Sequence, residues 1–516
     1  MRSTYFSVDL QRKHSLKNQT SPSPLEWSKP LNCCTELSRN GSRLKTTNQT
    51  IHILNAELMN SAGNTRLTNV TIVGGQFIEP ADHANSDEGS LIIDAKGCLL
   101  IPGLHDHHTH LIAYAASLTS VSCGPPDVMS EANLISALRG QPGSHWLRGT
   151  GYHESLFEHL DRQWLDSWGP DRPVRIQHRS GRLWILNSLG MKLIEDAAQN
   201  LNPTERARLT STNGRLFDVD ELLGTLTRSD APPVTLASKR LAAFGVTGIN
   251  DMTPSNDPET WQWFGELQNN HKLLQKVRMS GRLALSRCEQ TPQLSIGETK
   301  VHLHDSALLD FDEFVSIITA SHKKQRNIAV HCVTEVELVY TLSAFRAAGT
   351  RLGDRIEHGS VIPPALIEQL IELKLSVVTQ PNFIYERGDA YLKDIPKDEH
   401  AFLYRTNSLV KAGVPTAFGT DLPFGHPDPW AAMDAATKRK TVNGNQLNEG
   451  ECVTPELALN GFLGQLDAPS SIRTIKPGEA ADCCLLDAPW QALRGDLSSA
   501  HVQMTIRDGE LIYYRD

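Results

Sequence analysis

Short apolar strands alternate with longer helix-like stretches through the middle of this 516-residue chain, and this alternation limits the possible folds more than any other feature. Strand–helix–strand order is typical of parallel βαβ units. Eight such units close into a barrel of about 250 residues. We therefore predict an α/β fold with a TIM-like (β/α)8 barrel. The candidate strands are Leu99–His110, Thr247–Met252, Val277–Leu285, Thr299–His304, Ile328–Cys332, Arg355–His358, Ser376–Gln380 and Pro415–Thr420.

The two ends of the chain have a different pattern of apolar and polar residues from the middle. Residues 49–103 and 470–516 contain short alternating strands, and Asp508-Gly509 has the composition of a hairpin turn. Neither group can bury a face alone, so we expect both to pair in one small β-sandwich domain. Residues 1–48 are rich in Ser, Thr, Asn and Pro with little periodicity, which predicts a disordered tail.

The barrel is expected to span residues 104–469, with a long insertion at 118–235 after its first strand. The insertion contains strands of its own, in WLRGTGYHE and VRIQHRSG. A connection of this length between neighbouring strands is typically functional. We interpret it as a lid over the mouth of the barrel.

Composition excludes several classes of protein. Lys and Arg total 50 and Asp and Glu total 59, so the net charge of −9 does not favour nucleic acid as a partner. No apolar run reaches the roughly 18 residues that cross a membrane, so no membrane partner is expected. The nine cysteines lack CxxC spacing, and no signal peptide is recognisable, which together predict unlinked thiols and a cytoplasmic location. A homodimer is the expected assembly only because twofold oligomers are common.

Asp106-His107-His108-Thr109-His110 follows an apolar strand. Residues two apart share one face of a strand, so His108 and His110 point the same way and can share a cation. Imidazole nitrogens are ligands of zinc and similar divalent metals. An HxH pair alone is weak evidence, because a histidine is more often structural than ligating.

Four further polar residues close apolar runs: Lys300 in TKVHLH, His331 in IAVH, His358 in RIEH and Asp421 in AFGTD. His331 lies 31 residues after Lys300, His358 lies 27 after His331, and Asp421 lies 63 after His358. These intervals correspond to one, one and two βα repeats. The residues should therefore meet at the C-terminal ends of the strands, where barrel enzymes place their chemistry.

The motifs that carry these residues resemble those of the amidohydrolase superfamily, namely IPGLHDHHTH, AVHCV, RIEHG and GTDLPF. Their order is most similar to the amidohydrolase 3 (YtcJ-like) branch, which includes N-substituted formamide deformylases. GYHES, HRSGRLWILNS, DPWAAMDAATKRK and KPGEAADCCLLD resemble further motifs of that branch. The resemblance covers about residues 50–516, and it implies a metal-dependent hydrolase barrel.

The resemblance implies a role for each matching position. His108, His110, His331 and His358 would be metal ligands. Asp421 would be the eighth-strand aspartate, acting as a ligand or orienter, as the catalytic base, or as both. Lys300 matches a position that can carry a carboxylated lysine bridging two metals; a plain buried or salt-bridged lysine is the alternative. The expected cofactor is one or two divalent ions per chain, with Zn²⁺ preferred. The chain departs from the pattern at Arg182, where relatives carry histidine, and after Lys300.

A second group of residues is predicted to bind a small-molecule substrate: His153, Glu154, His178, Arg182, Gln380 and Asn382. Arg179 belongs to the same motif, and an arginine can bind a carbonyl or carboxylate group. Solvated surface residues, or salt bridges within the insertion, are the alternative for the members from the insertion. Asp106 and His107 are candidates for orienting the ligands. Tyr152, Trp184, Phe383 and Trp430 are candidate apolar walls, although aromatic residues at such positions are more often core.

These residues predict hydrolysis of a non-peptide C–N bond, in an amide or N-acyl group, by metal-activated water. Asp421 would accept the water proton and deliver it to the leaving nitrogen. Two alternatives stay open. One is a metal-binding regulator without catalysis, and the other is a deaminase or decarboxylase built on the same site.

Overall fold

The computed structural model describes residues 50–515, apart from 61–62, 80–89, 126, 144, 155, 158, 169–170 and 228–230. The tail predicted at 1–48 lies outside the described residues. Three β-sheets organise the described part: an eight-stranded parallel sheet, a second eight-stranded sheet made from both chain ends, and a five-stranded sheet in the insertion.

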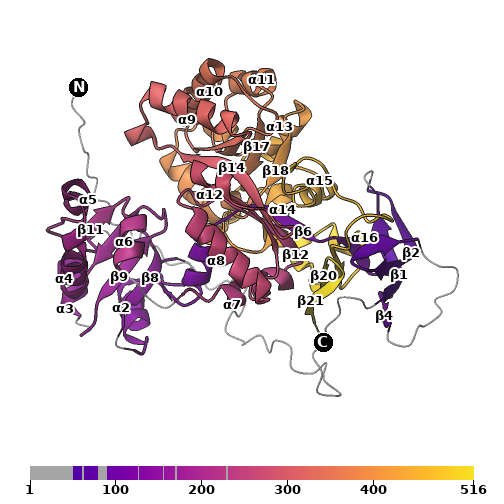
Figure 1. Cartoon of the computed structure of the whole chain (residues 1–516), viewed down its shortest axis with the longest axis horizontal. Coiled ribbons are helices and arrows are strands. Elements are labelled where there is room, and N and C mark those ends of the chain that lie inside the picture. The colour runs from indigo at the N-terminus through magenta and orange to yellow at the C-terminus, as the bar shows by residue number, and fades with distance from the viewer. Residues whose placement is uncertain are drawn as a thin grey trace, which may run out of the picture. The chain divides into compact units, whose positions relative to one another are not determined.

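The parallel sheet is the predicted barrel (Figure 1). Its strands follow one another in sequence order around the sheet, and its two edges meet through a bridge between Thr109 and Leu422. The amide of Asp421 also donates to the carbonyl of His108 at 2.8 Å. The strands are β6 (Leu104–Thr109), β12 (Val246–Asp251), β13 (Lys276–Gly281), β14 (Leu294–His302), β15 (Ile328–Cys332), β16 (Arg355–His358), β17 (Ser376–Thr379) and β18 (Thr416–Phe418).

Helices follow the barrel strands and cover them. Local sequence sets where these helices begin. In the helix after β15, for example, Thr334 and Glu337 form a reciprocal capping box. No helix in the described ranges is long and apolar enough to cross a bilayer. The main helices of the barrel are α1 (Leu111–Ser117), α7 (Val234–Ala243), α8 (Pro258–Asn269), α9 (Phe311–Lys323), α10 (Glu335–Ala348), α11 (Pro364–Glu372), α12 (Asn382–Asp394), α13 (Thr406–Lys411), α14 (Pro429–Lys438) and α15 (Pro455–Asn460).

The sheet of the chain ends joins segments that are far apart in the sequence, as the indigo and yellow strands of Figure 1 show. The central contact is antiparallel, between β5 and β19. A buried apolar cluster that includes Ile53, Leu100 and Met504 fills this part of the fold. The strands are β1 (Ile51–Met59), β2 (Thr65–Val73), β3 (Gln76–Ile78), β4 (Leu91–Asp94), β5 (Leu99–Pro102), β19 (Cys483–Leu486), β20 (Val502–Arg507) and β21 (Glu510–Tyr514).

The insertion forms its own sheet, in the order β11-β10-β9-β8-β7, with separate apolar clusters around it. Helices α2 (Glu131–Arg139), α3 (Arg162–Ser167) and α4 (Ser188–Ala197) accompany this sheet. The strands are β7 (Val121–Ser122), β8 (Leu147–Tyr152), β9 (Val174–His178), β10 (Leu183–Leu186) and β11 (Arg215–Phe217). The turn between β9 and β10 reaches the barrel, as described below.

Two predicted strands differ from the structure in organisation, and four others differ from it by one to five residues at an end. Leu99–His110 is not one strand, because β5 joins the sheet of the chain ends while β6 begins the barrel. Gly103 lies between them, where a Cβ atom would come within 2.3 Å of the Thr247 side chain. The strand predicted at Val277–Leu285 ends at Gly281, and Leu283–Arg287 forms a 3-10 helix.

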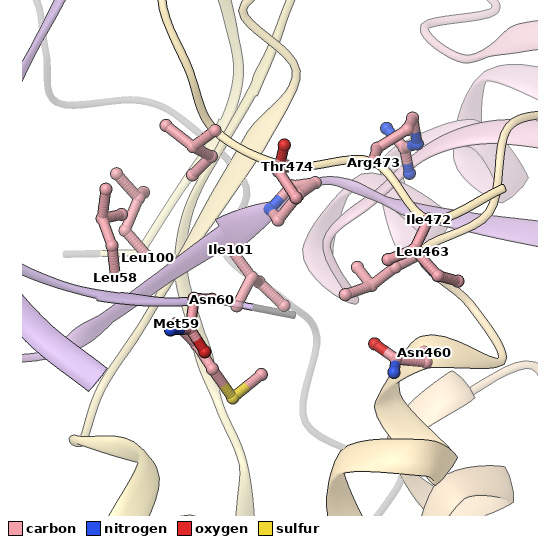
Figure 2. A pocket seen from close by; sticks show the side chains of 12 residues that line it. Leu58, Met59, Asn60, Leu100, Ile101, Asn460, Leu463, Ile472, Arg473 and Thr474 are labelled. Atoms are coloured by element: carbon pink, nitrogen blue, oxygen red, sulfur yellow. The ribbon is translucent and has the colours of Figure 1, made fainter. Parts of the chain in front are cut away.

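A small cavity lies between the sheet of the chain ends and the barrel (Figure 2). Leu58, Leu100 and Ile101 line it together with Leu463 and Ile472. Its volume of about 30 Å³ is close to the space of a single water molecule. This cavity is a packing defect at a junction and is too small for an organic substrate.

An ion pair also connects the barrel to the sheet of the chain ends. Lys276 of β13 contacts Asp482 at 2.7 Å and Asp508 at 2.6 Å, and its side chain is only 18% exposed. We expect Lys276→Met to lower the free energy of unfolding by about 3 kcal/mol, because it leaves partly buried carboxylates without their cation. Urea unfolding of the full chain measures this loss.

The matched control is Lys476→Met, which removes a cation from the exposed pair with Glu479. Exposed pairs contribute little to stability, so the control should unfold like the wild type. Equal stability of Lys276→Met and this control would show that the buried pair does not hold the two parts together.

Candidate metal centre

Three of the predicted ligands converge where the first and eighth barrel strands meet. Asp421 Oδ1 lies 3.3 Å from His110 Nε2 and 3.6 Å from His108 Nε2. One donor atom from each of these residues falls within 4.8 Å of the others, which is close enough to share one ion. His108 and Asp421 are buried, and His110 is 14% exposed.

The remaining histidines stand beside this group. The rings of His108 and His358 are 4.7 Å apart, and those of His358 and His331 are 4.4 Å apart. Register explains the proximity, because Cys332 of β15 pairs with His358 of β16. The predicted four-histidine set is thus gathered at one end of the barrel, although its role as a ligand set stays a prediction.

Backbone conformation distinguishes two of these residues. His358 and Asp421 adopt positive φ angles of 69° and 57°. Non-glycine residues seldom adopt this region, and such strain persists only where the surroundings enforce it. His358 is the last residue of β16 and Asp421 follows the end of β18 by three residues, so both lie where the chain leaves the barrel sheet.

Burial keeps the imidazoles neutral. It lowers the pKa of His358 to about 4, and it holds the pKa values of His108 and His331 well below their ordinary range. A neutral imidazole has a free lone pair, which a metal ion requires. Burial alone would raise the pKa of Asp421, but its interactions with His110 and His108 outweigh burial and keep it ionised.

Lys300 lies inside the barrel on β14, next to this cluster in the sheet. Its Nζ atom is buried and has no hydrogen-bond partner among the described residues. Burial lowers the pKa of Lys300 to about 8, with Arg355 acting in the same direction. Burying an amine without a hydrogen-bond partner costs free energy. Among the described residues, the Lys300 amine has no such partner.

A layer of polar groups orients the rings. Gln380 Oε1 lies 2.7 Å from His358 Nδ1, and Thr253 Oγ1 lies 3.0 Å from His110 Nδ1. Asp106 accepts hydrogen bonds from the amide of His108 and from Thr420, so it joins β6 to the loop after β18. In each case the contact fixes which way a predicted ligand faces.

Glu357 is the residue of this layer that the sequence interpretation missed. Its carboxylate contacts His108 Nδ1 at 2.5 Å and Arg355 Nε at 2.5 Å. Arg355 also faces Glu298 at 3.9 Å, and Glu298 pairs with Arg278 at 3.2 Å. A signal was available in the sequence, because Arg355 and Glu357 are opposite charges spaced two apart in a predicted barrel strand.

Other predicted residues lie elsewhere or have other contacts. His107 is buried beside His105 and makes no side-chain hydrogen bond in the described part, so no contact with a ligand ring is seen. Asn382 donates to Glu386 and to the carbonyl of Thr420, which positions the loop of Asp421. Trp430 packs in the main core and donates to Phe244.

The residues predicted in the insertion form a separate group. His178 Nε2 lies 2.8 Å from Glu154, which also pairs with Arg215 at 3.2 Å, and His153 lies beside His178. His153, Glu154 and His178 could geometrically hold a cation, but the adjacent arginine makes this unfavourable. These contacts stabilise the end of β9, where the β9–β10 turn begins.

That turn contacts the barrel mouth. Gly181 packs so closely on Phe424 that a Cβ atom would lie 2.7 Å from the ring, and the Phe424 ring is 5.4 Å from that of His110. Arg182 pairs with Asp218 at 2.6 Å and contacts His304, which follows β14. The insertion therefore meets the barrel beside the predicted ligand His110. Its predicted role as a lid stays a prediction.

The parallel barrel and its cluster of histidines with an aspartate define a metal-dependent hydrolase. The chain belongs to the amidohydrolase family, whose model matches residues 91–513. It is 23% identical to the amidohydrolase YtcJ of Bacillus subtilis over 488 residues, which are 82% of this chain and 90% of that protein. It is also 23% identical to the N-substituted formamide deformylase of Arthrobacter pascens over 489 residues, with the same coverage.

Solved structures show the same fold. An uncharacterized metal-dependent hydrolase from Pyrococcus horikoshii superposes with a TM-score of 0.72 at 20% identity, over 88% of this chain and all of that one. A metal-dependent hydrolase from Pyrococcus furiosus gives 0.67 at 22% identity, over 85% of this chain and 99% of that one. These superpositions establish the fold. Sequence identity this low leaves the substrate open.

The contact between Glu357 and His108 generates a prediction. Glu357→Gln removes the charge that increases the basicity of the His108 ring, so metal affinity should fall about 10- to 100-fold. Competition with a chelator measures the change. The control is Glu372→Gln, which alters an exposed partner of Arg346 far from the site and should keep the wild-type affinity. Unchanged affinity in Glu357→Gln, with folding verified by circular dichroism, would contradict the orienting role.

Proposed function

We propose that this chain hydrolyses a non-peptide C–N bond in a small molecule, an amide or an N-acyl group, with a divalent metal as cofactor. The observation that carries the proposal is the convergence of Asp421 Oδ1 on His110 and His108 within 3.6 Å. The family and the name of the formamide deformylase relative support the class of bond.

The residues present suit a divalent ion. Neutral imidazoles and one carboxylate are the donors that zinc prefers, so Zn²⁺ is the first candidate. His108, His110 and Asp421 would hold one ion, and His331 and His358 would hold the same ion or a second one. Lys300 suits a bridging role, because a lysine must be neutral to be carboxylated and its lowered pKa makes that form accessible.

A bound divalent ion would polarise the substrate carbonyl and make water a better nucleophile near neutral pH. The chain supplies the proton transfers. Asp421 is ionised and accepts the proton of the attacking water as the new C–O bond forms. It then delivers that proton to the nitrogen as the C–N bond breaks. The strained backbone at Asp421 and the hydrogen bonds to the neighbouring Thr420 hold the carboxylate in place for both transfers.

Removal of the ligands tests the metal centre. The double variant His108→Ala/His110→Ala should lose its bound metal and keep a folded barrel. Elemental analysis of purified protein measures the metal, and circular dichroism measures the fold. Two metals per wild-type chain, with a labile carbon dioxide adduct in gentle mass spectrometry, would support a carboxylated Lys300. A normal metal content in the double variant would remove these histidines from the site.

Asp421→Asn tests the proton transfers. The metal should largely remain while the turnover of an amide substrate falls by about 100-fold or more, because proton transfer by a positioned group contributes this much. Metal content and kcat are measured on the same preparation. Full activity would exclude Asp421 from the mechanism. Product analysis on the wild type separates amide hydrolysis from deamination or decarboxylation.

A further inference from the structure

Arg179 holds a positive charge at the mouth of the barrel without a partner. It lies in the β9–β10 turn, half-buried, and its guanidinium makes no hydrogen bond or ion pair with any residue that the structure describes. The nearby Glu154 is already engaged by His178 and Arg215. Asp394, at the end of α12, is exposed and lies beyond ion-pair distance.

Arg387 of α12 is a second half-buried cation near this turn. It stacks over the ring of Phe383 at 3.8 Å and donates a hydrogen bond to the carbonyl of Phe424. Within the described part of the chain no carboxylate forms an ion pair with it. The adjacent Glu386 accepts hydrogen bonds from Asn382 and from the amide of His426 instead.

Phe424 connects these two arginines to the metal centre. The turn that carries Arg179 packs on the Phe424 ring through Gly181, and Arg387 holds the carbonyl of Phe424. The same ring contacts that of His110. Burial lowers the pKa of Arg179, and the charge of the nearby Arg387 acts in the same direction. Arg387 and the turn that carries Arg179 thus both contact Phe424, whose ring lies beside that of the proposed ligand His110.

We propose that Arg179 and Arg387 together bind a carboxylate of the substrate, so that the enzyme acts on N-acyl compounds that carry a free carboxylate, such as N-acyl amino acids. This inference rests on the proposed function, because it places the carboxylate relative to the amide that is cleaved. Two half-buried cations beside the same phenylalanine would be stabilised by an anion bound between them. The planar donor fork of arginine matches the two oxygens of a carboxylate.

Binding to a hydrolytically impaired protein tests the proposal separately from turnover. The probes are N-acetyl and N-formyl derivatives of leucine, phenylalanine and aspartate, each paired with its neutral α-carboxamide. Isothermal titration uses the full-length, metal-loaded Asp421→Asn protein. At least one acid should bind about tenfold or more tightly than its carboxamide, since a charge-assisted hydrogen bond to arginine contributes that much.

Variants assign the preference to the arginines. Arg179→Gln and Arg387→Gln, each in the Asp421→Asn protein, should weaken binding of the acid about tenfold and leave the carboxamide unchanged. Arg387→Lys keeps the charge and should recover part of the loss, which also covers poor folding of Arg387→Gln. Arg346→Gln is the control, since this exposed arginine of α10 pairs with Glu372 away from the site.

The outcomes separate the two proposals. Hydrolysis of amides by the wild type, without a preference for the acid in any pair, would overturn the carboxylate site and leave the proposed function intact. A preference that survives in both arginine variants would also overturn it, because the metal itself would then bind the carboxylate. A preference that depends on both arginines, without hydrolysis by the wild type, would support the carboxylate site and refute the proposed function.

Discussion

The carboxylate of Glu357 is the group on which the arrangement of the centre depends. It is buried between Arg355 and His108, with Glu298 and Arg278 continuing the alternation of charge through the barrel. Charges inside a protein are tolerated only when they are paired, so each charged side chain in this row restricts where the next one can lie. The ring of His108 is therefore fixed from within the barrel, independently of any bound ion.

The opposite side of the centre is built from chain turns. His358 and Asp421 leave their strands with positive φ angles, and Gln380 and Asp106 hold the resulting loops. A rigid inner layer of paired charges and an outer layer of strained turns together define the histidine cluster. The insertion brings the β9–β10 turn beside this cluster, where Arg182 pairs with Asp218 of the insertion and contacts His304 of the barrel. The candidate site thus lies on the barrel, with a turn of the insertion beside it.

Much of the barrel follows from local pattern. The strands at Ile328–Cys332 and Arg355–His358 have the predicted bounds, because a short apolar run ending in a histidine has few other structures in a βα repeat. The two strands within Leu99–His110 were harder to predict from local pattern. Both halves of the segment are buried strands, and nothing local shows that the first half pairs with a strand nearly 400 residues later while the second begins the barrel.

The sequence by itself determined the fold class and the residues of the candidate metal centre, since both depend on residue type and on spacing along the chain. Only the tertiary structure decided which groups surround that centre. Glu357 meets His108 across 249 residues, and the turn at Gly181 meets Phe424 from another sheet. Contacts of this kind depend on how strands close and how loops pack, and no periodicity in the sequence records them. The contacts that Arg387 and the turn of Arg179 make with Phe424 are of the same kind.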